Sequence, residues 1–284
     1  MRHMLIFGLG YTTGRLARRL IGDGWRVTAT RRDAVDGALA FDDADAVRTS
    51  LATATHIISS VPPGDDGRDP VLTRYGADIM TSPTRWIGYI SATGVYGDTG
   101  GAWVDERAPI GHGRRGARAE ADLAWGGVRD DVRVFRLPGI YGPGRSAIDR
   151  LLDGRARRID LPGQVFSRVH VDDIVSGIVA GFEGPPGVYN LADDYPCSQN
   201  RVIEAACALS GLPLPPLLSL EEAKLTPMAR GFYGENRRIA NGKAKRLLRW
   251  TPRYPTYREG LARIAMTMPA IDSAAPAAAS VDQR

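Results

Sequence analysis

The stretch "LIFGLGYTTGRLARRL", residues 5–20, joins a short apolar run to an amphipathic pattern through a turn of glycines. The run that ends at Gly8 is typical of a buried strand, whereas Leu16 and Leu20 recur at the spacing of one helical face. Gly8 and Gly10 stand where the strand would turn into the helix. A strand, a glycine turn and a helix in this order predict the first unit of a doubly wound sheet.

The same turn predicts a site for the diphosphate of a dinucleotide. Glycines let the backbone approach a pyrophosphate closely, and the following helix offers N–H groups and a positive dipole at its amino terminus. The third glycine of the usual G-x-G-x-x-G spacing falls on Thr13, with Gly14 beside it. The alternative is a glycine turn without a ligand, but the position between a strand and a helix favours binding. The candidate residues here are Gly8, Gly10, Tyr11, Thr12 and Thr13.

The rest of the first half repeats the alternation of strand and helix. Near-continuous apolar runs occur at 25–30, 55–61, 85–91 and 131–137, as expected of strands that are covered on both faces. Helical patterns fall between them, at 44–52, 70–80 and 114–128. This spacing predicts an α/β fold, a Rossmann-type doubly wound parallel sheet with a small, mostly helical C-terminal substrate lobe.

The pattern also suggests how the chain is divided. Residues 1–145, completed by 170–195, would form the dinucleotide-binding domain, and 146–169 with 196–267 the substrate lobe. From 196 onward we expect short helices and proline-rich turns with little sheet. The stretch 268–284 is rich in Ala, Ser and Pro, which predicts a disordered tail.

The end of the second apolar run bears on the choice of dinucleotide. An acidic residue there would bind the ribose hydroxyls of NAD, but the chain reads Thr30, Arg31, Arg32. A guanidinium pairs well with a 2′-phosphate, so NADP is favoured and NAD is the second choice. Asp33 would restore NAD if the strand ended later. Two more cofactor candidates are Asp42, which could instead cap the helix at 44–52, and Ser59 at the end of the next strand.

Composition excludes several other classes. The net charge of +5 comes from scattered arginines without a nucleic-acid motif, so no nucleic-acid partner is expected. Two isolated cysteines suit neither a disulfide framework nor a metal site. No export signal or membrane-length apolar run is visible, which predicts a cytoplasmic protein without a membrane partner.

Four phrases together resemble the extended short-chain dehydrogenase/reductases, the group of NAD-dependent epimerases and dehydratases. The phrases are "SATGVYGD" at 91–98, "FRLPGIYGPGR" at 135–145, "RVHVDDIVSGI" at 168–178 and "GVYNLADD" at 187–194. The resemblance implies a Rossmann-type domain, a smaller lobe that encloses a substrate cleft, and a nicotinamide cofactor. A homodimer through the fourth and fifth helices is common in that family and is a further expectation.

The family's usual Tyr-x-x-x-Lys pair is absent, because the first lysine is Lys224 and no tyrosine has a lysine four residues on. The usual Ser/Thr partner falls on Ala92, with hydroxyls on either side at Ser91 and Thr93. If Glu120 matches the glutamate that commonly follows the lysine, the tyrosine position falls on His112. Its charge would come from Arg114, Arg115 or Arg118. The alternative is a surface histidine in a glycine loop.

Other family positions complete the candidate site. The catalytic candidates are Thr93, His112 and Tyr96, although Tyr96 is more typical of packing beneath the cofactor. Further cofactor contacts are Ser91, Pro138 and Tyr141. Arg145 and Arg168 are substrate candidates, and with Arg237 and Arg238 they favour an anion. Asp172 and Asp173 are expected to cap a helix.

These residues predict an NAD(P)-binding oxidoreductase or epimerase-like protein. It would transfer hydride on an alcohol or ketone of a small, nucleotide-sugar-like anionic substrate. The alternative is a catalytically degenerate NADP-binding sensor or partner-binding module.

Overall fold

The computed structural model describes residues 1–35, 37–113 and 116–267, and its centre is a parallel sheet of seven strands. The strand order is β11-β7-β5-β4-β1-β2-β3, with every pair parallel. The strands are β1 (His3–Phe7), β2 (Arg26–Arg31), β3 (Leu39–Ala40), β4 (His56–Ser59), β5 (Trp86–Ala92), β7 (Val132–Leu137) and β11 (Gly187–Asn190). The predicted doubly wound fold is confirmed, with its topological switch between β1 and β4.

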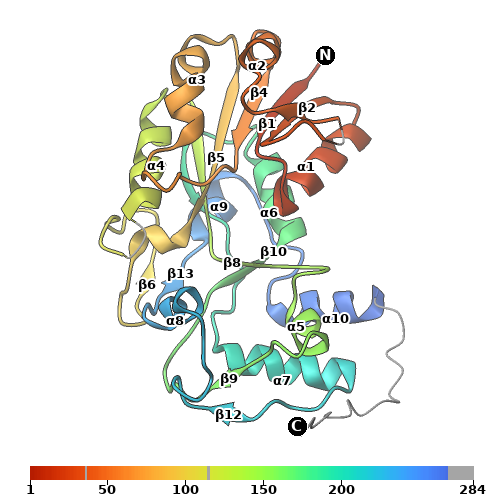
Figure 1. The fold of residues 1–284 in the computed structure, drawn as a ribbon, viewed down its shortest axis with the longest axis vertical. Coiled ribbons are helices and arrows are strands. Elements are labelled where there is room, and N and C mark those ends of the chain that lie inside the picture. Colours follow the sequence, from red (N-terminus) through yellow and green to blue (C-terminus); the bar gives the residue numbers. More distant parts are fainter. Residues whose placement is uncertain (36, 114–115, 268–284) are drawn as a thin grey trace, which may run out of the picture.

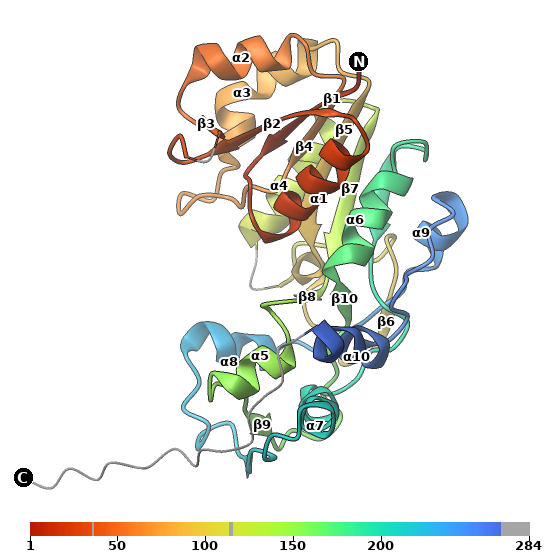
Figure 2. The same cartoon turned by 90° about the vertical axis from the view of Figure 1, so that its right-hand side faces the viewer.

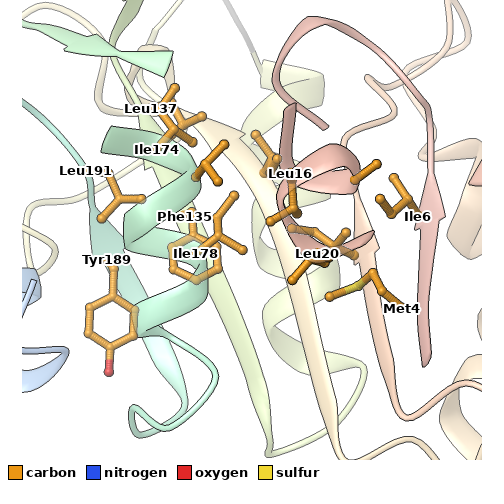
Figure 3. Close-up of a cluster of buried hydrophobic side chains, with 14 of the residues drawn as sticks. Met4, Ile6, Leu16, Leu20, Phe135, Leu137, Ile174, Ile178, Tyr189 and Leu191 are labelled. Carbon is orange, nitrogen blue, oxygen red and sulfur yellow. The ribbon is translucent and has the colours of Figure 1, made fainter. Parts of the chain in front are cut away.

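Helices cover both faces of this sheet because alternate residues of its strands point to opposite sides. Met4 and Ile6 of β1 pack with α1 (Tyr11–Gly22) and α6 (Val171–Ala180), as Figure 3 shows. Leu5 and Phe7 lie in the opposite cluster, with α2 (Ala44–Leu51), α3 (Pro70–Thr81) and α4 (Gly116–Gly127). All five residues of β1 are buried, which fits the near-continuous apolar run in the sequence.

A second layer lies beyond the carboxyl ends of the strands (Figures 1 and 2). It contains α5 (Ala147–Leu152), α7 (Gln199–Ser210), α8 (Pro227–Tyr233) and α10 (Tyr257–Thr267), with the short pairs β8 (Gly139–Tyr141)–β10 (Arg168–His170) and β9 (Arg158–Ile159)–β12 (Leu217–Leu218). A small apolar core holds α5, α7 and α10 together. At 12 residues, α7 is longer than the short helices expected after 196.

Part of the C-terminal segment returns to the sheet. The strand β13 (Arg238–Ile239) pairs with β6 (Trp103–Val104), and α9 (Gly242–Leu247) packs against β11. The helix α9 therefore lies beside the seven-stranded sheet, whereas β13 and β6 form a separate two-stranded sheet; the residues of β13 and α9 fall within the expected substrate lobe of 196–267. The expected tail at 268–284 lies outside the described residues. Within the described ranges, no helix combines the length and apolarity that a membrane span requires.

Candidate functional site

A cavity of about 860 Å³ lies between the carboxyl edge of the sheet and the second layer. The glycine turn, the ends of β5 and β7, and residues of α5, α7 and α8 all line it. Of the residues predicted from sequence, the cavity brings together Gly10, Tyr11, Thr12, Thr13, Ser91, Thr93, Arg118, Pro138, Tyr141, Arg145, Arg168 and Arg237. The other candidates lie outside this lining.

The glycine turn is built as a phosphate cradle requires. Gly8 has a φ of +86°, and a Cβ there would lie 3.0 Å from the side chains of Ser60 and Val61. At Gly10 a Cβ would meet no described atom within 4 Å, so this residue faces open space. The Thr13 hydroxyl donates to the Gly8 carbonyl oxygen at 2.7 Å and accepts from the Gly10 N–H at 2.9 Å. Thr13, at the third glycine position, therefore fixes the turn through these two hydrogen bonds.

The end of β2 lies beside this turn. The strand ends at Arg31, whose Nε donates to the Leu9 carbonyl oxygen at 3.3 Å, and Arg32 follows directly. Asp42 is exposed and pairs with Arg74 at 3.4 Å. The residue that caps α2 is Asp43, whose side chain accepts from the Ala46 N–H, so the capping role considered for Asp42 is wrong.

At the end of β4, the serine that lines the cavity lies one residue later than the predicted Ser59. Ser59 is fully buried, and its hydroxyl accepts from the Val61 N–H at 3.4 Å. Ser60 lines the cavity instead, with its hydroxyl 2.7 Å from the Gly8 carbonyl oxygen. Successive side chains of a strand face opposite ways, which explains why neighbouring serines differ so much.

Tyr96 lies in a buried polar cluster rather than in the cavity. Its hydroxyl donates to Asn190 Oδ1 at 2.8 Å and accepts from Arg136 Nη1 at 3.0 Å. Burial raises the pKa of Tyr96 above its ordinary value. These contacts make Tyr96 part of the support beneath the site.

His112 is exposed and does not line the cavity. The backbone at His112 and Gly113 crosses closely over Gly97, where a Cβ would lie 2.9 Å from the Gly113 nitrogen. This crossing holds the histidine outside the cleft. Of the three arginines considered beside it, Arg118 lines the cavity, whereas Arg114 and Arg115 lie outside the described residues.

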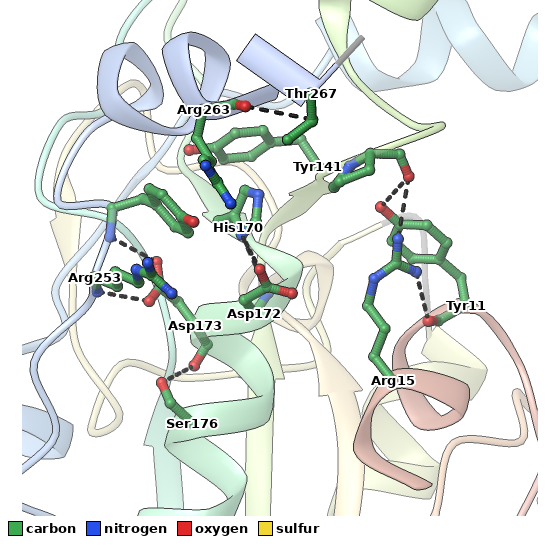
Figure 4. Close-up of polar contacts among 12 residues, drawn as sticks. Tyr11, Arg15, Tyr141, His170, Asp172, Asp173, Ser176, Arg253, Arg263 and Thr267 are labelled. Carbon is green, nitrogen blue, oxygen red and sulfur yellow. Dashed lines mark hydrogen bonds and ion pairs between the residues drawn. The ribbon is translucent and has the colours of Figure 1, made fainter. Parts of the chain in front are cut away.

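Tyr141 lines the cavity near the junction of the two layers, where Figure 4 places it above His170. The two rings meet edge to face with centroids 5.1 Å apart. Burial raises the pKa of Tyr141 well above its ordinary value, so its hydroxyl stays protonated and is a poor proton donor. Burial also lowers the pKa of His170 to about 4, which keeps the imidazole neutral.

Across the opening, Tyr11 and Arg15 of α1 both reach the loop after β8. The Tyr11 hydroxyl and Arg15 Nη2 donate to the Pro143 carbonyl oxygen at 3.0 and 3.2 Å (Figure 4). The Arg15 guanidinium also lies over the Tyr11 ring, 4.0 Å from its centroid. These contacts tie the glycine turn to the loop that carries Arg145.

Positive charge dominates the cavity. Among the residues that the structure describes, seven arginines line it, against one carboxylate, Glu235; the arginines are Arg118, Arg145, Arg150, Arg155, Arg157, Arg168 and Arg237. Arg168 donates to the Phe166 carbonyl oxygen at 2.8 Å and to Gln199 Oε1 at 3.2 Å, both uncharged groups. Burial lowers the pKa of Arg150, and the like charges of Arg168 and Arg145 add to this effect. The sequence pointed to Arg145 and Arg168 but missed Arg150, which lies between the recognisable phrases at 135–145 and 168–178.

The chain matches no family model, but three curated proteins align with it. The 3-diazoavenalumate denitrifying reductase of a Streptomyces species is 32% identical over 142 residues, which is 46% of each chain. This chain therefore spans less than half the length of that reductase. Protein YeeZ of Escherichia coli K12 is 26% identical over 243 residues, 76% of this chain and 86% of YeeZ.

Solved structures match nearly the whole chain. A conserved Silicibacter pomeroyi protein of unknown function is 43% identical with a TM-score of 0.83, and 94% of this chain and 99% of that one are covered. The human epimerase family protein SDR39U1, solved with NADPH, is 16% identical with a TM-score of 0.75, covering 94% and 100%. The UDP-glucose 4-epimerase of Thermotoga maritima, solved with UDP-glucose, is 17% identical with a TM-score of 0.71, covering 93% and 97%.

Proposed function

Because the chain belongs by motif and fold to the extended short-chain dehydrogenase/reductases, we propose that it binds NADP and transfers hydride to or from a small anionic alcohol or ketone. The observation that carries the proposal is one continuous cavity that runs from the glycine turn to an arginine-lined lobe. A bound nicotinamide would supply the hydride; the protein must hold both reactants.

The glycine turn fits the diphosphate of a dinucleotide. The space above Gly10 is open, and α1 begins directly after it, so its first N–H groups lie at the amino end of a 12-residue helix. Gly8 supplies the left-handed turn that other residues rarely adopt. Tyr11, Thr12 and Thr13 line the cavity at the same place.

NADP is favoured over NAD by the end of β2. Arg31 ends the strand and Arg32 follows it, where an NAD-binding protein of this fold carries a carboxylate. Two guanidinium groups attract a 2′-phosphate, whereas a carboxylate repels it. SDR39U1 was solved with NADPH, which agrees with this choice.

An anionic substrate follows from the charge of the lobe. Arg145, Arg150 and Arg168 lie in the cavity, and none has a carboxylate partner among the described residues. A phosphate or carboxylate would balance them by charge-assisted hydrogen bonds. Aromatic side chains of Phe166 and Tyr233 line the same region and would pack against a ring of the substrate.

The absent Tyr-x-x-x-Lys pair favours a second candidate, a sensor that binds NADP without catalysis. Emission from NADPH separates binding from chemistry. In both cases, titration with the protein should shift or enhance the fluorescence emission of NADPH, and NADPH should bind more tightly than NADH. An oxidoreductase should also oxidise NADPH with some member of a panel of anionic ketones and aldehydes, whereas a sensor should not.

Gly10→Val gives a sharp control, because its added atoms enter the open space where the diphosphate would lie. The φ of −117° at Gly10 suits any residue, so the fold should survive. We expect the variant to keep its unfolding temperature and to lose dinucleotide binding at least tenfold. Gly126→Ala, also in open space but in α4, should bind like the parent. Equal binding by Gly10→Val would contradict the proposed cofactor site.

A further inference from the structure

Arg118 of α4 lies near the end of β5 and has no carboxylate partner among the described residues. It is half-buried in the first turn of α4 and lines the cavity together with Ser91 and Thr93. Among the described residues its hydrogen-bond partner is neutral: Nη1 donates to the Tyr89 hydroxyl at 2.9 Å. A guanidinium has five N–H donors, so most of them stay available to a ligand.

The natural partner for Arg118 on this helix is Asp122, one turn later, but the fold uses Asp122 elsewhere. Its carboxylate accepts from Arg136 Nη2 at 2.7 Å and Nε at 3.0 Å, in a bidentate pair. The Ser91 hydroxyl donates to the same carboxylate at 2.6 Å. Since Asp122 is fully engaged, the charge of Arg118 is left unbalanced in the cavity.

Tyr89 holds Arg118 in place. The Tyr89 ring stacks on Trp125 with centroids 5.2 Å apart and planes 9° apart. Trp125 Nε1 in turn donates to Asp69 Oδ2 at 2.8 Å, and Asp69 caps α3. Burial raises the pKa of Tyr89 to about 12, so its hydroxyl remains neutral. Arg118 is thus fixed by a buried stack that does not cancel its charge.

We infer that Arg118 binds the reacting oxygen atom of the substrate and stabilises the negative charge that develops on it. This rests on the hydride transfer proposed above. In the reducing direction a reduced nicotinamide, when bound, would supply the hydride that the carbonyl carbon gains, and the C=O π pair would move onto oxygen. That oxygen is held by Arg118 and takes its proton from water at the open side of the cavity. Because a guanidinium keeps its proton at all ordinary pH values, Arg118 acts by charge and not as an acid.

The role predicts a selective defect in Arg118→Met. NADPH affinity should stay within threefold of the parent, whereas kcat/KM for the reactive carbonyl should fall about 100- to 1,000-fold, as for loss of an oxyanion donor. Added guanidinium ions should restore part of the rate in Arg118→Met. Arg118→Lys should retain more activity than Arg118→Met. Glu120→Gln, exposed on the same helix, should behave like the parent.

Three results would overturn the inference: turnover by Arg118→Met within threefold of the parent, loss of NADPH affinity together with turnover, or no rescue by guanidinium. If the parent reduces no carbonyl in the panel, formate titrated into NADPH-loaded protein is the deciding probe. Formate at Arg118 should alter the emission of bound NADPH in the parent and in Arg145→Met, but not in Arg118→Met. Equal responses in all three proteins would overturn it.

Failure of the proposed function would give a different result from failure of the role inferred for Arg118. If neither dinucleotide binds, the proposed function fails, and the heat of formate binding to the unliganded protein tests Arg118 alone. A component of that heat should disappear in Arg118→Met and persist in Arg145→Met. Identical heats in the parent and in Arg118→Met would overturn the anion site at Arg118.

Discussion

Replacement of Asp122 by asparagine would leave a buried arginine without its counter-charge. Asp122 is 2% exposed and Arg136 is 4% exposed, and their bidentate contact lies between α4 and β7. Arg136 also donates to Tyr96, which anchors it to β11 through Asn190. Asparagine keeps the shape and one acceptor oxygen but removes the negative charge.

The expected cost is about 3–5 kcal/mol, the usual loss when one partner of a buried ion pair is removed. Because asparagine still accepts one hydrogen bond, the lower end of this range applies. At about 2–4 °C for each kcal/mol in domains of comparable size, the midpoint of unfolding should fall by about 6–12 °C. An exposed pair behaves differently, since it contributes about 0–1 kcal/mol.

Thermal unfolding followed by circular dichroism checks this value. Asp78→Asn is a matched control, because Asp78 pairs with Arg48 at 3.1 Å on the surface, and its midpoint should move by no more than about 4 °C. The double variant Asp122→Asn with Arg136→Met should recover part of the loss, since no unpaired charge then remains. If Asp122→Asn unfolds at the same temperature as Asp78→Asn, the reasoning is refuted.

Three further changes test other parts of the molecule. Gly260→Ala should cost about 1–3 kcal/mol, because the added Cβ would overlap the Tyr141 hydroxyl; an unchanged unfolding midpoint would contradict this. Burial raises the pKa of Asp193 to about 7. The free energy of unfolding of the wild type should therefore fall by up to about 4 kcal/mol as the pH rises from about 4 through about 7. Unfolding measured across this pH range should show a smaller fall in Asp193→Asn. Arg31→Ala and Arg32→Ala should each weaken NADPH binding about tenfold and leave NADH binding unchanged. Fluorescence titration with both dinucleotides measures the two affinities, and an unaltered ratio between them would contradict the assignment.

The sheet and its glycine turn could be predicted because their signals are local. The apolar runs at β1, β4, β5 and β7 are nearly continuous, since both faces of these strands are covered by helices. Gly8 and Gly10 follow directly on β1 and precede α1. Each of these features depends on neighbours within a few residues, so periodicity alone was sufficient.

The site could be predicted only in part, because it depends on pairs that are distant in the sequence. The Tyr96 hydroxyl is bonded to Asn190, 94 residues away, and no pattern around "VYG" indicates that partner. Ser59 and Ser60 are equivalent in sequence, yet only the second reaches the cavity. The choice between them depends on where β4 ends, which a pattern locates only to within a residue or two.

His112 illustrates a different limit. Its assignment counted residues backward from Glu120 through a glycine-rich loop, where register is not tied to helical geometry. The contact of Gly113 with Gly97 turns the loop so that His112 lies outside the cavity. Within α4 the periodicity is reliable, and there the helix presents Arg118 to the cavity and Asp122 to Arg136.

The unbalanced charge in the lobe is itself an argument for an anionic ligand. Like charges close together destabilise a folded protein, and the lowered pKa of Arg150 beside Arg168 and Arg145 reflects that repulsion as well as burial. In the described part of the chain, no ion pair offsets these three arginines, although carboxylates pair with arginines at several surface positions. An anion that binds only the folded chain would remove the repulsion and stabilise the protein. The energetic cost of placing Arg145, Arg150 and Arg168 together is therefore explained if their charge is used to bind an anion.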